Sequence, residues 1–226
     1  MLSGDKLKKQ VIIVAGGKGK RMHAEIPKQF LNISGKPILF HTMECFYKYS
    51  NEIEIILILP EPFIDFWNSL SKKYELNIDH QIEVGGDTRY QSVKNGLRHV
   101  TDPSLVAIHD GVRPLVSKNT LNRVFKKAKE TGNAIPIVKI NESVRRLDEE
   151  ENFPVNRREY RLIQTPQCFH SDLIKRAYQQ EYSDSFTDDA TVVESLGVKI
   201  NLVEGNSENI KITRPGDMKI AEALLK

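Results

Sequence analysis

The chain has 226 residues, a formal net charge of +3 at pH 7 and 39% hydrophobic residues, a composition typical of a globular protein. Its longest apolar run, residues 53–59, contains a glutamate and is far shorter than the ~20 residues of a membrane-spanning helix, so no membrane association is expected. The mild charge and the lack of one long basic run argue against nucleic acid as a partner. The polar start resembles no secretory signal, and Cys45 and Cys168 have no metal-binding or redox spacing, so we expect a cytoplasmic protein.

The first predicted strand, residues 11–14, ends in a turn that is rich in glycine and positive charge. Gly16, Gly17 and Gly19 allow backbone N–H groups to approach a ligand closely, as in sites that bind phosphate. The four cations between positions 18 and 28 supply charge that a polyphosphate needs. The alternative is a tight strand-to-helix turn with solvated lysines.

This turn differs from two widespread nucleotide-binding loops. A P-loop requires a glycine where Val14 stands and a serine or threonine where Arg21 stands. A dinucleotide-binding loop requires a third glycine where Met22 stands, and an acidic residue about 20 positions further on. The turn is therefore expected to bind a nucleotide in another way.

The following segments alternate between helix and strand. Helical spacing is found at 38–49, 63–70, 90–97 and 121–128, and strand-like runs at 53–59, 81–84, 105–108 and 134–140. Asp87 or Thr88 can cap the helix that follows the third strand. This order predicts an α/β fold, a Rossmann-like, mostly parallel sheet with helices on both faces, in a single domain over residues 1–226.

The alternation breaks at about 139–156, where the sequence is too polar for a core. We expect a protruding β-arm, a hairpin with an acidic turn, that lies against a second copy of the chain. A surface loop is the alternative.

A further polar group lies where the fourth strand ends. Asp110 and Arg113 are expected to share a crevice with the glycine turn, because ligands of open parallel sheets bind at the carboxyl ends of strands. A carboxylate beside a nucleoside triphosphate is a suitable Mg²⁺ ligand, and a turn or capping role is the alternative. We expect His109 to support this group by packing or hydrogen bonding.

The last third carries short polar motifs that are weak individually. One of them, residues 209–217, predicts a strand end before a C-terminal helix. In its order of motifs the chain resembles the 2-C-methyl-D-erythritol 4-phosphate cytidylyltransferases over residues 10–225: A-G-G-x-G-x-R-M, P-K-Q, G-G-x-x-R-x-x-S-V, H-D-G-V-R-P, T-P-Q, T-D-D-A and N-I-K-I-T-R-P-x-D.

The resemblance implies roles for the matching residues. Those expected to be catalytic are Arg21, Lys28, Arg157 and Lys211. Those expected to bind the nucleotide are Ala15, Gly16, Gly17, Gly19, Gly86, Asp87 and Ser92. Those expected to hold the polyol phosphate are Arg113, Ser143, Thr165 and Thr187, with Asp110 as the metal ligand. The family's arm crosses to a neighbouring subunit, so Ser143, which replaces the usual threonine, and Arg157 are expected to serve the partner's site in a homodimer.

The implied activity is a CTP-dependent nucleotidyltransferase that uses Mg²⁺ and joins CMP to 2-C-methyl-D-erythritol 4-phosphate in non-mevalonate isoprenoid biosynthesis. The attacking phosphate is already anionic, so the site needs positioning and charge neutralisation more than a strong base. Cations, glycines and one acid suit that task. A ribitol 5-phosphate cytidylyltransferase and a non-catalytic nucleotide-binding regulator are the alternatives.

Overall fold

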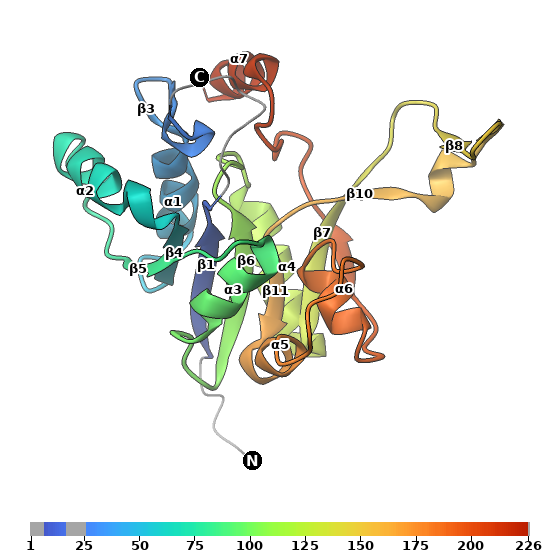
Figure 1. Cartoon of the computed structure of the whole chain (residues 1–226), viewed down its shortest axis with the longest axis horizontal. Coiled ribbons are helices and arrows are strands. Elements are labelled where there is room, and N and C mark those ends of the chain that lie inside the picture. Colours follow the sequence, from blue (N-terminus) through green and yellow to red (C-terminus); the bar gives the residue numbers. More distant parts are fainter. Residues whose placement is uncertain (1–6, 17–25, 226) are drawn as a thin grey trace.

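The computed structural model describes residues 7–16 and 26–225, and a mixed sheet lies at its centre (Figure 1). Among these residues the central strand order is β10-β7-β11-β6-β1-β4-β5, with β12 paired to β7. The pairs that join β1 to β6, β1 to β4, β4 to β5 and β12 to β7 are parallel, whereas β11 runs antiparallel to both its neighbours and β10 runs antiparallel to β7. The strands are β1 Lys8–Val14, β4 Glu54–Leu59, β5 Gln81–Val84, β6 Ser104–Asp110, β7 Asn133–Lys139, β10 Arg161–Ile163, β11 Gln167–His170 and β12 Leu202–Glu204.

Helices cover both faces of this sheet. One face packs against α1 Ile38–Tyr49, α2 Ile64–Lys73 and α4 Lys118–Thr131, and the other against α3 Arg89–Leu97, α5 Ser171–Ala177 and α6 Asp189–Glu194. Alternate residues of β1 serve the two cores: Val11 and Ile13 belong to the first and Ile12 to the second. A strand that is covered on both sides buries every side chain, which explains the continuous apolar runs of the sequence. The observed sheet with helices on both faces confirms the predicted fold class.

Two helices begin at polar side chains that cap their first turn, and one of these, Thr88, is a cap that the sequence predicts. The Thr88 side chain accepts a hydrogen bond from Gln91 N at the start of α3, at 3.0 Å. Asp188 accepts one from Thr191 N at the start of α6, at 2.9 Å. Both caps satisfy N–H groups that the first helical turn leaves without a partner.

The C-terminal helix α7, Pro215–Leu224, forms a third small core above the sheet. Its Ala221 packs with Ile33, Ile38, Val112 and Ile212, near the short hairpin of β2 Asn32–Ile33 and β3 Lys36–Pro37. The strand end expected near residue 209 is wrong: β12 ends at Glu204, and residues 209–213 are irregular. A short 3-10 helix, η2 Lys28–Phe30, comes between β1 and β2, and another, η3 Glu61–Phe63, follows β4.

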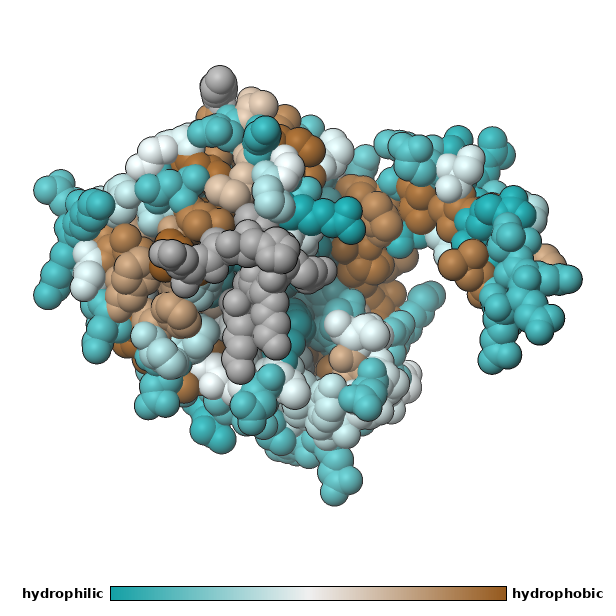
Figure 2. Space-filling model, turned by 45° about the horizontal axis from the view of Figure 1, so that its top comes forward, coloured by the Kyte–Doolittle hydropathy of each residue, from teal (hydrophilic) through white to brown (hydrophobic). Residues whose placement is uncertain are grey.

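The polar excursion is a protruding hairpin, which confirms the expected local structure. Strand β8, Arg145–Leu147, pairs antiparallel with β9, Asn152–Pro154, around an acidic turn. The excursion extends past residue 156, because η4, Arg157–Glu159, precedes the return of the chain to the sheet at β10. Figure 2 shows this arm standing away from the body, with hydrophobic surface on both sides of the hollow between them.

No helix in the described ranges combines the length and apolar character that a membrane span requires.

Candidate active site

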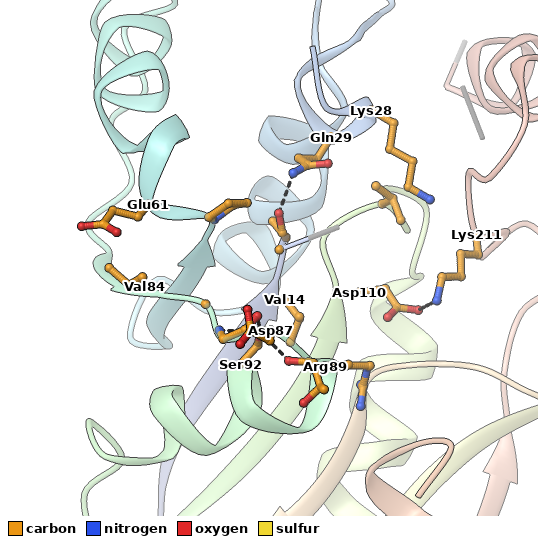
Figure 3. A pocket seen from close by; sticks show the side chains of 17 residues that line it. Val14, Lys28, Gln29, Glu61, Val84, Asp87, Arg89, Ser92, Asp110 and Lys211 are labelled. Carbon is orange, nitrogen blue, oxygen red and sulfur yellow. Dashed lines mark hydrogen bonds and ion pairs between the residues drawn. The ribbon is translucent and has the colours of Figure 1, made fainter. Parts of the chain in front are cut away.

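A cavity of about 550 Å³ opens where four parallel strands end (Figure 3). Its lining includes the last residue of β1, β5 and β6 and the residue that follows β4. These are Val14, Val84, Asp110 and Pro60. The carboxyl ends of neighbouring parallel strands meet at one edge, which is where open α/β sheets bind their ligands.

The glycine segments form the side of the cavity next to α3. Gly86 N donates to Ser92 Oγ at 3.0 Å, and Ser92 Oγ donates to Thr88 O at 2.9 Å. A Cβ at Gly86 would overlap the Gln91 side chain, and one at Gly16 would come within 3.6 Å of Ser92 Oγ. Ser92 therefore holds the Gly86 segment against the start of α3, and both Gly16 and Gly86 line the cavity beside it.

Gln29 fixes the described part of the glycine turn. Its Nε2 donates to Ala15 O at 2.5 Å, and Ala15 N donates to Ile58 O at 3.0 Å. Gln29 is 1% exposed, so this contact is shielded from water. Its neighbour Lys28 donates from Nζ to Ile212 O at 3.0 Å and so ties the start of the chain to its end.

Asp110 is the charged centre of the opposite side. Its Oδ2 lies 2.9 Å from Arg113 Nε and 3.2 Å from Lys211 Nζ. Burial alone would raise the pKa of Asp110, but the nearby cations Lys211, Arg89 and Arg113 outweigh it and hold that pKa well below its usual range. The carboxylate is thus ionised throughout the physiological pH range.

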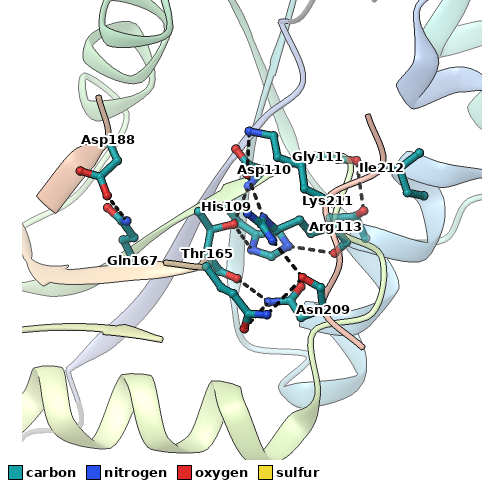
Figure 4. Close-up of polar contacts among 12 residues, drawn as sticks. His109, Asp110, Gly111, Arg113, Thr165, Gln167, Asp188, Asn209, Lys211 and Ile212 are labelled. Carbon is teal, nitrogen blue, oxygen red and sulfur yellow. Dashed lines mark hydrogen bonds and ion pairs between the residues drawn. The ribbon is translucent and has the colours of Figure 1, made fainter. Parts of the chain in front are cut away.

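A buried polar network lies directly behind Asp110 (Figure 4). Burial lowers the pKa of His109 to about 4, so its ring is neutral at pH 7. Because Nε2 faces Arg113 O at 3.0 Å, the single ring N–H lies on Nε2, and Nδ1 accepts from the Thr165 hydroxyl at 3.0 Å. The Thr165 hydroxyl also accepts from Asp110 N at 3.1 Å. His109 is therefore a supporting residue, as expected, and the hydroxyl of Thr165 is engaged inside the protein.

Arg89 is a lining residue to which the sequence reasoning gave no role. Its Nη1 and Nη2 bind the two oxygens of Asp189 at 2.8 and 2.7 Å, and the Tyr178 hydroxyl donates to the same carboxylate at 2.6 Å. Asp189 is fully buried. Arg89 stands in a quoted motif, but its partner is 100 residues away, so only the folded chain reveals the pair.

The comparisons with known proteins agree with this architecture. The sequence profile of the 2-C-methyl-D-erythritol 4-phosphate cytidylyltransferase family matches residues 10–226. The chain belongs to that family. A cytidylyltransferase of this name from Bacteroides thetaiotaomicron is 50% identical over 219 residues, which are 97% of this chain and 100% of the relative. The one from Bacteroides fragilis is 52% identical over 214 residues, 95% of this chain and 98% of the relative.

Solved structures of the family share the fold. The 4-diphosphocytidyl-2C-methyl-D-erythritol synthase of Anaerococcus prevotii superposes with a TM-score of 0.82 at 30% identity, covering 97% of this chain and 96% of its own. The cytidylyltransferase of Thermus thermophilus gives 0.78 at 30% identity, with 96% and 98% covered. Family membership confirms the predicted enzyme class: the chain is a nucleotidyltransferase.

The cytidylyltransferase cavity brings together many of the predicted site residues. Those that line it are Ala15, Gly16, Lys28, Gly86, Asp87, Ser92, Asp110 and Lys211. Arg113 and Thr165 lie behind it, in contact with Asp110. Ser143, Arg157 and Thr187 are exposed and do not line it. Gly17, Gly19 and Arg21 lie outside the described residues.

The acidic residues of the site fit a metal ion that is shared with phosphates. The described residues contain no group of three or more His, Cys, Asp or Glu side chains that could hold a metal alone. Both cation contacts of Asp110 are made by Oδ2. A single carboxylate of this kind suits Mg²⁺, which is commonly bound by one or two carboxylates together with substrate phosphates and water.

Proposed function

We propose that the chain transfers CMP from CTP to 2-C-methyl-D-erythritol 4-phosphate, which gives 4-diphosphocytidyl-2-C-methyl-D-erythritol and pyrophosphate. The observation that carries this proposal is the family match over residues 10–226, combined with a cavity that holds the family's glycines and cations at one strand edge. The names of the relatives indicate which substrate is used, and the residues that line the cavity are suited to bind it.

In the proposed reaction a phosphate oxygen of the polyol attacks the α-phosphorus of CTP. A new P–O bond forms as the bond to the β-phosphate oxygen breaks, and pyrophosphate takes that electron pair. The nucleophile is already an anion, so no side chain has to remove a proton. The protein's task is to align the two phosphates and to neutralise the charge between them.

The described residues divide this task between two sides of the cavity. Gly16, Gly86 and Ser92 lie where the cytosine and ribose would be held, close to backbone N–H groups. Lys211 pairs with Asp110 at the other side, and Lys28 lines the cavity above them in Figure 3, where the phosphates would be. Arg21 is proposed to join them, as the family's motif implies.

Asp110 is proposed to hold Mg²⁺, which would neutralise part of the charge of the triphosphate. Arg113 and Lys211 keep the Asp110 carboxylate ionised and oriented. The polyol phosphate is proposed to lie on the same side, near Arg113, Thr165 and Thr187.

The arm is proposed to complete the site of a second subunit. Ser143 and Arg157 do not line the cavity of their own chain, and the arm projects away from it (Figure 1). The arm and its base expose Leu147, Phe153, Tyr160, Leu162 and Ile163, with Leu147 79% exposed. Several large apolar side chains exposed on a projecting arm are typical of a protein interface, which supports a homodimer formed by exchange of arms.

The test is release of pyrophosphate from CTP and Mg²⁺ with each of two acceptors, 2-C-methyl-D-erythritol 4-phosphate and ribitol 5-phosphate. We expect kcat/KM to be at least about 100-fold higher for the first. A preference for ribitol 5-phosphate would replace the substrate assignment. Binding of CTP without pyrophosphate release from either acceptor would instead favour a nucleotide-binding regulator.

A further inference from the structure

The segment that carries Lys211 is held by buried residues on both sides. Asn209 and Ile212 are fully buried, whereas the Lys211 side chain is 42% exposed. Ile212 N donates to Val112 O at 3.0 Å, which anchors the segment just after Lys211. The lysine therefore projects from a backbone whose position is fixed by its neighbours.

Asn209 makes the second anchor, just before Lys211, and connects three parts of the chain (Figure 4). Its Nδ2 donates to Thr165 O at 2.8 Å and lies 3.4 Å from Gln164 Oε1. Its backbone oxygen accepts from Arg113 Nη1 at 2.9 Å. One buried residue thus joins the Lys211 segment to the residues before β11 and to the loop after β6.

We propose that Asn209 is a positioning residue for the transfer reaction, an inference that rests on the function proposed above. Its side-chain amide fixes the backbone two residues before Lys211, and its carbonyl fixes Arg113. Lys211 and Arg113 both bind Asp110 Oδ2. Asn209 therefore sets the distance at which Lys211 approaches that carboxylate. Asn209 itself does not line the cavity, so its effect on the reaction passes through the groups that it holds, of which Lys211 lines the cavity.

The chemistry makes this position important. A transfer that needs little acid or base catalysis depends on the alignment of its charged groups, and a displacement of about 1 Å can reduce such a rate by about 100-fold. Loss of the amide leaves Thr165 O, inside the protein, without its donor. The segment is then expected to shift, and Lys211 with it.

The test compares Asn209→Ala with Asn133→Ala, a control of equal burial at another place. Asn133 is 1% exposed, and its Nδ2 donates to Lys199 O at 3.0 Å. Both substitutions remove a buried amide that holds a backbone carbonyl. With CTP and 2-C-methyl-D-erythritol 4-phosphate, we expect kcat to fall about 10- to 100-fold for Asn209→Ala and less than about threefold for the control. Equal losses in kcat would overturn the proposal.

A double-mutant cycle decides whether the effect passes through Lys211. In a Lys211→Ala background, Asn209→Ala is expected to lower kcat by less than about threefold, because the group it positions is already gone. The same fold loss in both backgrounds would contradict the proposed role. Asn209→Asp, which keeps the size of the side chain but has no amide donor, takes the place of the alanine variant if that variant does not fold.

A structural measurement separates this inference from the proposed substrate. In a crystal structure of Asn209→Ala, we expect the distance from Lys211 Nζ to Asp110 Oδ2, 3.2 Å in the parent chain, to exceed 4 Å. An unchanged distance would refute the positioning role. A parent protein inactive toward both polyol phosphates would refute the proposed function, and the crystal comparison would still decide the role of Asn209.

Discussion

Lys28 and Lys211 reach the same end of the cavity from opposite ends of the sequence. Lys28 Nζ donates to Ile212 O at 3.0 Å. Lys211, which directly precedes Ile212 in the sequence, pairs with Asp110. Negative charge moves onto the transferring group and the leaving phosphate as the reaction proceeds. Cations fixed at this place are therefore expected to stabilise the transition state more than they stabilise bound CTP.

Replacement of Lys28 by alanine tests whether this cation stabilises the transition state more than it stabilises bound CTP. We expect kcat for pyrophosphate release to fall by about 10²- to 10³-fold, and the dissociation constant for CTP to rise less than about tenfold. Steady-state kinetics and calorimetric titration with CTP measure the two effects. Lys48→Ala is the control, since Lys48 is exposed and pairs with Glu44 on the surface. If kcat stayed at the parental value, Lys28 would be only a binding residue.

His109 makes the stability of the fold depend on pH. Burial lowers the pKa of His109 to about 4, whereas a histidine in an unfolded chain titrates near 6.5. Between these values the unfolded chain binds more protons, so the free energy of unfolding falls as the pH falls. The stabilisation is complete above about pH 6.5 and is lost progressively toward pH 4.

Urea denaturation in metal-free buffer at pH 7, 6 and 5 measures this dependence. We expect His109 to contribute a loss of up to about 1.4 kcal/mol per pH unit below pH 6.5. His109→Gln should flatten the slope by that amount. A parental slope in His109→Gln would show that His109 is not the titrating group.

At the residue scale, sequence reasoning found the groups at the end of a strand, with His109 as a support beside them, and missed the supporting residues whose partners lie far along the chain. Asp110 and Arg113 were predicted because they come directly after a buried strand. Arg89 and Asn209 were given no role, because their partners lie far along the chain and no spacing pattern links them. Long-range hydrogen bonds of this kind exist only once the topology is known.

At the scale of elements, the start of α3 and the glycines before it act as one unit. Gly86 N, Ser92 Oγ and Thr88 O form a chain of hydrogen bonds across the first turn of the helix. Asn95 Nδ2 donates to Val84 O at 2.9 Å and ties the same helix to the end of β5. These hydrogen bonds therefore fix the position of the glycine segment relative to α3 and to the end of β5.

Gly86→Ala tests this unit. The added Cβ would overlap Gln91, so the glycine segment or the helix start must move, which typically costs about 1–3 kcal/mol. We expect the KM for CTP to rise roughly tenfold, measured at saturating polyol phosphate. Gly216→Ala is the control, because a Cβ there meets nothing within 4 Å. Equal KM values for the two variants would show that the cytosine base of CTP does not bind beside Gly86.

The elements themselves were largely predictable, because parallel strands buried on both faces read as short apolar runs. Strand β4 and helix α1 occur where the pattern placed them. The irregular segment 209–213 was misjudged because its alternating apolar residues, Ile210 and Ile212, resemble a strand. Both instead pack with the small core under α7, while Asn209 holds the backbone to neighbouring loops.

At the scale of the whole molecule, the arm gives one chain surfaces that it cannot cover alone. Leu147 is 79% exposed on the arm, and Leu162 and Leu202 are 53% and 51% exposed on β10 and β12. The sequence predicted a hairpin from its polarity and acidic turn, but a hairpin's partner cannot be read from one chain. The exposed apolar surface is the physical reason to expect a second copy.

Mixing of two inactive variants tests whether the arm serves the partner's site. One variant is Lys28→Ala, whose lesion is in the cavity, and the other is Arg157→Ala, whose lesion is on the arm. If the arm acts on the neighbouring subunit, a mixed dimer contains one site with both lesions and one site with neither. Random exchange makes about half of all dimers mixed, so about a quarter of the parental activity should return.

The control for this mixing is a pair of lesions in the same cavity, Lys28→Ala with Lys211→Ala, which cannot complement each other whatever the arm does. Light scattering on each variant verifies that it forms a dimer before subunits are exchanged. If Arg157 served its own chain, every site in the mixture would keep one lesion, and the mixture would be as inactive as its components. Recovered activity from the first pair alone would therefore assign Arg157 to the partner's site, because no arrangement within a single chain produces it.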